Sequence, residues 1–126
     1  MSQRINIVFA QPPDGVSDED FNGWYDQHID EILAVPGFAA AQRFRIAPEV
    51  VDPEVPAPYS YIAIFEVDAD PETITAEKTK RGLITKESYR ELKKSDPSGP
   101  PLPDWWDGVR FASWNAVAVS ERAEAR

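Results

Sequence analysis

Cysteine is absent from this 126-residue chain, and histidine occurs once, as His28. The lack of cysteine excludes a disulfide framework, a thiolate metal site and a thiol nucleophile. One histidine excludes a metal site built from several histidines of a single chain. The carboxylates could still hold Ca²⁺ or Mg²⁺, but no EF-hand-like spacing occurs. We therefore expect no metal and no cofactor.

Basic residues are also few, with 13 Lys and Arg against 22 Asp and Glu, which gives a formal net charge of -9. Nucleic acids and anionic membrane surfaces are bound through basic patches, so we expect neither as a partner. The chain has no apolar run of the kind found in signal peptides or membrane spans. We expect a cytoplasmic protein with a single domain at 1–120 and a frayed tail at 121–126.

The chain is organised around residues 21–38. Ser17, followed by three acidic residues, is a good N-cap, and Pro36-Gly37 is a helix stop. The apolar and aromatic positions between them have the three-to-four-residue period of an amphipathic helix. They are Phe21, Trp24, Tyr25, Ile29, Ile32 and Leu33.

His28 lies four residues after Trp24 and four before Ile32, which places it with the apolar face or at its edge. One interpretation is a half-buried histidine that packs beside a tryptophan and makes one hydrogen bond. The other is a general acid/base at the mouth of an aromatic pocket, because histidine titrates near neutral pH. The helix pattern alone does not separate the two.

Four segments have strand patterns, at 5–10, 38–46, 60–67 and 109–120, and two have helix patterns, at 72–83 and 85–94. A loop with four prolines at 47–58 would join the second and third strands. Alternation in the second strand predicts that Phe38, Ala40 and Phe44 share one face, and Arg43 and Arg45 the other. These arginines either extend into solvent, or Arg43 orients an anionic or carbonyl-bearing ligand.

Two further features lie near the C-terminus. Residues 95–108 contain four prolines, two glycines, and Trp105 and Trp106. This segment is either a surface loop pinned by one buried tryptophan or a lid that closes over a ligand. In the last strand, Ser113 and Asn115 stand among apolar residues and need polar partners. They either bond across the sheet or contribute polar groups to a cavity.

The order strand, helix, strand, strand, helices, strand is the β-α-β-β-α-β order of the ferredoxin-like plait, an α+β fold with helices on one face of an antiparallel sheet. Yet the third and fourth strands carry apolar residues on both faces. Soluble monomers rarely expose a large apolar face. We therefore expect a homodimer whose two sheets pack face to face into an α/β barrel.

The segment 24–28, with its aromatic residues and histidine, together with Val35-Pro36-Gly37-Phe38, resembles EthD-like members of the dimeric α/β-barrel superfamily. In place of the proline-containing segment that commonly follows the histidine in that group, this chain has Ile29-Asp30-Glu31. Members include polyketide cyclases, dehydratases, isomerases, cofactor-independent monooxygenases, haem-degrading enzymes and proteins without known activity. The resemblance implies a small, often aromatic ligand between helix and sheet, and it carries His28 alone over as a site residue.

We therefore predict a cofactor-free enzyme in which His28 is the general acid/base on a small aromatic or polyketide-like carbonyl compound, in cyclase, dehydratase, isomerase or lyase chemistry. Tyr25, Tyr61 or Asn115 would stabilise the developing enolate oxygen. The predicted substrate-binding residues are Trp24, Tyr25, Arg43, Tyr61, Trp105, Trp106, Trp114 and Asn115. The alternatives are a non-catalytic binding or accessory dimer, a cofactor-independent monooxygenase, or a haem protein with His28 as axial ligand.

Overall fold

The computed structural model of the protein describes residues 3–47 and 54–126; the middle of the predicted loop at 47–58 lies outside the described residues. The described residues form four strands, three α-helices and one short 3₁₀-helix. In order, these are β1 (Arg4–Gln11), α1 (Asp18–Leu33), β2 (Phe38–Arg45), β3 (Tyr61–Val67), α2 (Pro71–Lys80), α3 (Lys86–Ser95), η1 (Trp106–Gly108) and β4 (Arg110–Val117).

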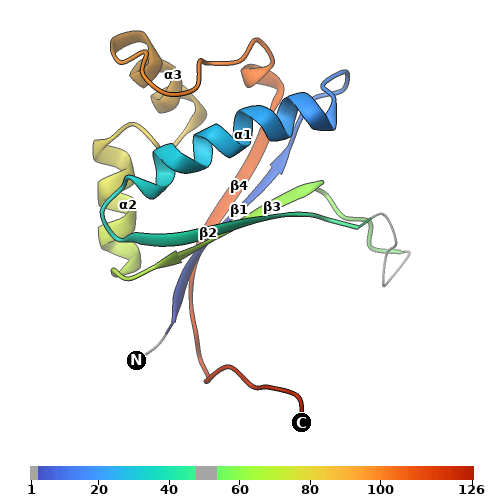
Figure 1. Ribbon diagram of the computed structural model, residues 1–126, viewed down its shortest axis with the longest axis vertical. Coiled ribbons are helices and arrows are strands. Elements are labelled where there is room, and N and C mark those ends of the chain that lie inside the picture. Colours follow the sequence, from blue (N-terminus) through green and yellow to red (C-terminus); the bar gives the residue numbers. More distant parts are fainter. Residues whose placement is uncertain (1–2, 48–53) are drawn as a thin grey trace.

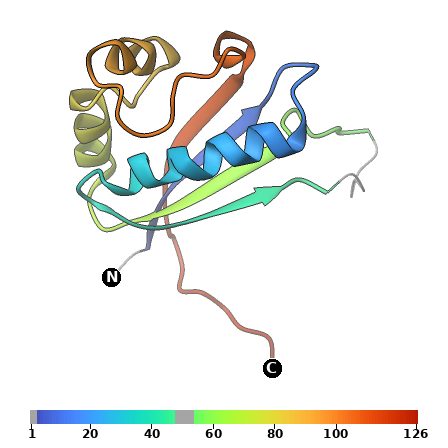
Figure 2. The same cartoon turned by 45° about the horizontal axis from the view of Figure 1, so that its top comes forward.

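The four strands form one antiparallel sheet in the order β2-β3-β1-β4. Helices α1, α2 and α3 lie on the same side of this sheet, as Figures 1 and 2 show. The arrangement is the ferredoxin-like fold, which confirms the prediction from the sequence. Every helix in the described part of the chain is too short or too polar to cross a membrane.

The helix-facing side of the sheet forms the floor of the core. Strand register aligns Asn6, Phe65 and Asn115 on this side, and likewise Ala10, Tyr61 and Phe111. The aromatic face of α1 packs onto this floor, because the apolar residues recur with the period of an α-helix and therefore lie on one side of it. As predicted, the hydroxyl of Ser17 accepts a hydrogen bond from the Asp20 backbone and caps α1.

The predicted alternation of β2 is wrong at its first residue. The pairing with β3 shifts between Phe38 and Ala40, where a β-bulge adds one residue to the strand. Phe38 therefore turns into the core, with its ring centroid 5.4 Å from that of Phe65. It shares the helix-facing side with Arg43 and not, as alternation predicted, with Ala40 and Phe44.

None of the helices in the described part of the chain lies on the opposite side of the sheet, which is largely apolar (Figures 1 and 2). Its central residues are isoleucines of β1 and β3, flanked by Phe44 on one edge strand and Trp114 on the other. Phe44 is 42% exposed and Trp114 is 59% exposed. We call this surface the open sheet face. A single copy of the described chain leaves these large apolar side chains in contact with water.

Candidate functional site

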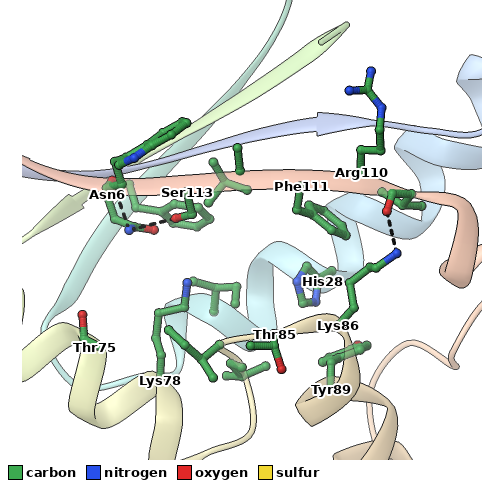
Figure 3. A pocket seen from close by; sticks show the side chains of 18 of the residues that line it. Asn6, His28, Thr75, Lys78, Thr85, Lys86, Tyr89, Arg110, Phe111 and Ser113 are labelled. Atoms are coloured by element: carbon green, nitrogen blue, oxygen red, sulfur yellow. Dashed lines mark hydrogen bonds between the residues drawn. The ribbon is translucent and has the colours of Figure 1, made fainter. Parts of the chain in front are cut away.

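A cleft of about 870 Å³ lies between the helix-facing side of β1 and β4 and the helices α1, α2 and α3. Figure 3 shows this central cleft, with His28 projecting into it from α1, Lys78 from α2 and Tyr89 from α3. The strands contribute Asn6 from β1 and Ser113 from β4. A cleft large enough for a small ligand therefore lies between helix and sheet, where the resemblance implied a ligand.

His28 is only 8% exposed, and its ring makes one hydrogen bond within the described residues, from Nδ1 to the Glu31 carboxylate at 3.1 Å. Residues three apart on a helix lie on the same face, so α1 by itself holds this pair together. Glu31 also accepts hydrogen bonds from the Tyr89 hydroxyl at 2.5 Å and from the Lys93 ammonium at 2.6 Å. Helix α3 thus fixes the carboxylate that orients the imidazole.

The tautomer of His28 follows from this network. Burial alone would raise the pKa of Glu31, but hydrogen bonds from His28, Lys93 and Tyr89 bring it below its usual value. Glu31 is therefore an ionised acceptor at neutral pH, and His28 Nδ1 must carry the hydrogen. Nε2 has no hydrogen bond within the described residues and is not among their fully enclosed unpaired atoms. Its lone pair is accessible from the central cleft.

Burial also sets the charge of His28. It lowers the pKa of the imidazole below its usual value, and the positive charges of Lys78 and Lys93 act in the same direction, against the opposing effect of Glu31. The imidazole is therefore neutral at pH 7. A neutral ring with Nδ1–H held by a carboxylate and an accessible Nε2 is suited to accept a proton.

Aromatic rings enclose His28 on three sides. Trp24 stacks on the imidazole at a centroid distance of 4.9 Å. The rings of Tyr25 and Tyr89 make T-shaped contacts with it, at centroid distances of 5.5 and 5.0 Å. The Trp24 indole N–H donates to the Pro101 carbonyl at 2.7 Å, which fixes the stacking ring. The imidazole thus sits in an apolar cage open toward the cleft.

The predicted site residues divide into two groups. Four of them line the central cleft beside His28, namely Tyr25, Trp106, Trp114 and Asn115. The other four are outside its lining, namely Trp24, Arg43, Tyr61 and Trp105.

Among the lining residues, Trp114 is at the rim only. Its strand register places it on the open sheet face, where its ring lies 6.0 Å from that of Phe9. Among the residues outside the lining, Arg43 packs 4.3 Å above the Tyr25 ring and pairs with Asp26, and the Tyr61 hydroxyl bonds to Asp18. Tyr61 thus uses its hydroxyl at the edge of the core, whereas Nη2 of Arg43 is buried without a hydrogen-bond partner among the described residues.

The tryptophans of the predicted loop are held by the core. Trp106 is buried, and its indole N–H donates to the Lys86 carbonyl at 3.1 Å. Trp105 packs against Phe21 and Trp24, both at 5.5 Å. Of the two interpretations, the geometry resembles a loop pinned by buried tryptophan more than an open lid.

Sequence reasoning missed Glu31, Tyr89, Lys78 and Asn6. Glu31 had a signal, because its spacing from His28 places both on one helix face. Asn6 had another, because it interrupts the apolar run of β1 on the inward-facing parity. Tyr89 and Lys78 reach the cleft through tertiary packing of α3 and α2, for which the local sequence has no marker. Across the described residues, no three His, Asp or Glu side chains converge as a metal site would require.

Comparisons with known proteins show the fold. No protein-family model matches the chain, and no curated protein matches it. Among solved structures, a DABB family protein with a ferredoxin-like fold from Mesorhizobium loti is 11% identical, with TM-score 0.57. The match covers 95% of this chain and 100% of the other. A dimeric ferredoxin-like protein from an uncultured marine organism is 11% identical, with TM-score 0.54 and coverages of 97% and 100%. SnoaB, a cofactor-independent oxygenase from Streptomyces nogalater, is 12% identical, with TM-score 0.51 and coverages of 95% and 95%.

Proposed function

We propose that this protein is a cofactor-free enzyme in which His28 removes a proton from a carbon next to a carbonyl group of a small organic substrate. The observation that carries the proposal is the oriented His28–Glu31 pair, whose accessible Nε2 faces a cleft of ligand size. A positioned base of this kind contributes typically about 10²–10⁴-fold to a reaction rate. Glu31 is the positioning residue, and Nε2 is the atom that takes the proton.

Tyr25 is the candidate donor to the enolate oxygen that forms when the proton leaves. It lines the central cleft, and its ring lies 5.5 Å from that of His28. Burial raises the pKa of Tyr25 to about 12, although the Arg43 charge above it acts in the opposite direction. The hydroxyl therefore keeps its proton at neutral pH and can donate it in a hydrogen bond. Asn115, at the cleft edge, is a second candidate donor.

The substrate class that this site favours is a small aromatic or polyketide-like carbonyl compound, because aromatic side chains surround the base and exclude water. Cyclisation, dehydration, isomerisation and lyase reactions of carbonyl compounds can each begin with such a proton transfer. A cofactor-independent oxygenase among the proteins of like fold is consistent with chemistry without a cofactor. The EthD-like relationship is part of the same proposal, and it rests on the segment from Trp24 to His28 and on Pro36-Gly37.

The test is deuterium uptake in D₂O, followed by NMR, at the carbon beside the carbonyl of aryl ketones, β-keto acids and lactones. The wild-type protein should catalyse exchange for at least one compound class, and His28→Gln should lose it. Glu31→Gln should slow the exchange, because Glu31 positions His28. Asp30→Asn is its matched control, because Asp30 is exposed on the same helix and carries the same charge. Equal exchange by wild type and His28→Gln would remove His28 from the mechanism. Saturable binding without exchange would assign the cleft to a non-catalytic binding protein.

We also propose that two copies of the chain pack through their open sheet faces. Helices α1, α2 and α3 cover the other side (Figure 2), and Phe44 and Trp114 are exposed on this one. A protein of like fold from an uncultured marine organism is described as dimeric. A second sheet would remove these apolar side chains from water.

Light scattering coupled to size exclusion tests the dimer. The wild-type protein should have twice the mass of one chain, and Phe44→Glu should have the mass of one. Val119→Glu is the control, because Val119 is fully exposed in the C-terminal segment and lies outside the sheet. A wild-type protein that stays monomeric at micromolar concentrations would refute the proposal.

A further inference from the structure

The charge in the central cleft is opposite to the charge of the chain. Although acidic residues outnumber basic ones by 22 to 13, no carboxylate is among the described residues that line the cleft. Three cationic side chains do line it, namely Lys78, Lys86 and Arg110. Two of them are already occupied: Lys86 donates to the carbonyls of Asp107 and Val109, and Arg110 donates to that of Pro58.

Lys78 is the exception. Helix α2 places it one turn after the core residue Ile74, so both side chains point inward, and Lys78 is only 7% exposed. Its ammonium makes no ion pair or hydrogen bond with any described residue, and its nitrogen is not among their fully enclosed unpaired atoms. Figure 3 shows the ammonium directed into the cleft, on the side of Asn6. A charge withdrawn from water and left without a partner costs free energy, which favours a ligand that supplies the opposite charge.

The groups beside Lys78 are arranged as hydrogen-bond donors. Asn6 is 3% exposed, and its amide nitrogen donates to the Ser113 hydroxyl at 3.3 Å and to the Asn115 side-chain oxygen at 3.0 Å. The Asn115 amide in turn donates to the Thr75 hydroxyl at 3.4 Å. Since both hydroxyls accept from an asparagine, each keeps its own proton to donate to a ligand. The Asn6 side-chain oxygen is fully enclosed and has no hydrogen-bond partner among the described residues.

We propose that the central cleft takes a small organic acid, whose carboxylate is bound by the Lys78 ammonium and the Ser113 hydroxyl while the rest of the molecule extends toward His28. This proposal rests on the proposed function for the role of His28, and it adds the substrate class. The carboxylate site at Lys78 and the base His28 are electrostatically coupled, because the charge of Lys78 contributes to lowering the pKa of His28. The carbanion that forms on the substrate when His28 takes the proton would also be stabilised by the same ammonium.

The experiment measures binding of three acids and their neutral amides to the whole protein by calorimetry: benzoate, 2-naphthoate and benzoylacetate, with benzamide, 2-naphthamide and benzoylacetamide. At least one acid should bind about 10-fold or more tightly than its amide, as expected for a charge-assisted hydrogen bond. Lys78→Met should remove this preference by weakening the acid alone, and Lys78→Arg should retain part of it. Lys80→Met is the matched control, because Lys80 is exposed on the same helix.

The results separate this proposal from the proposed function. Binding of an acid that is unchanged in Lys78→Met, or failure of all three acids to bind at millimolar concentrations, would overturn the carboxylate site. Neither result bears on deuterium exchange catalysed by His28. Conversely, an acid preference that depends on Lys78 and persists in His28→Gln would support the carboxylate site even if no exchange is found.

Discussion

The hydrogen bond between His28 and Glu31 has a consequence that can be measured directly. In Glu31→Gln, the acceptor stays but its charge is removed, and with it the group that raises the pKa of His28. A hydrogen bond to a charged group contributes about 1.5–3 kcal/mol, and one pKa unit corresponds to about 1.4 kcal/mol. The pKa of His28 should therefore fall by about one to two units. Lys93, no longer neutralised by Glu31, acts in the same direction.

The assay is an NMR titration of the His28 ring protons, which needs no assignment because the chain has one histidine. Nitrogen-15 shifts in the same samples should show hydrogen on Nδ1 in the wild-type protein, and a mixed population of tautomers in Glu31→Gln. Asp30→Asn, with the same loss of charge at an exposed position, should leave the titration close to that of the wild type, because exposed charges are screened. An unchanged or raised pKa in Glu31→Gln would refute the pairing on which the proposed mechanism depends.

Three further predictions concern stability, each measured by urea unfolding. Lys78→Met should raise the free energy of unfolding by about 1 kcal/mol, because it removes an unpaired buried charge; a loss of that size would show instead that Lys78 stabilises the fold. Because the pKa of His28 is lowered in the folded state, the unfolded chain binds the proton first as pH falls below 6.5. Stability should therefore decrease through that window by up to about 1.4 kcal/mol per pH unit, and the decrease should be smaller in His28→Gln; equal slopes would contradict this. Gly37→Ala should cost about 2 kcal/mol or more, because Gly37 has φ +99° and a Cβ there would lie 2.9 Å from Ile74 Cδ1. Gly15→Ala, at φ +89° with open space around it, should cost less, and equal losses would exclude the contact as the cause.

The part of the site that lies on one helix could be predicted from the sequence. The spacing of Trp24, Tyr25 and His28 fixes their common face before any tertiary contact forms, and the structure stacks Trp24 on the imidazole. Glu31 follows the same rule, because it lies three residues after His28 on the same helix. Local period was sufficient here, because the geometry of a helix is determined by its own backbone.

The sequence was less informative where a backbone irregularity or a long-range contact decides the outcome. The bulge in β2 reverses the side on which Phe38 lies, and alternation cannot anticipate an inserted residue. Arg43 has the parity of the helix-facing side, yet it packs on Tyr25 away from the cleft lining. Parity selects a face of the sheet, and the position of α1 over that face selects which part becomes a cavity.

By itself, the sequence determined the ferredoxin-like order of elements, the aromatic face of α1 and the inward position of His28, because these depend on local period, capping and turns. Only the tertiary structure placed Tyr89 and Lys93 against Glu31, and an unpaired Lys78 beside Asn6 and Ser113 in the same cleft. Those neighbours come from α2, α3 and two strands that are far apart along the chain. The charge of His28, and the kind of ligand that the cleft favours, are properties of that packing.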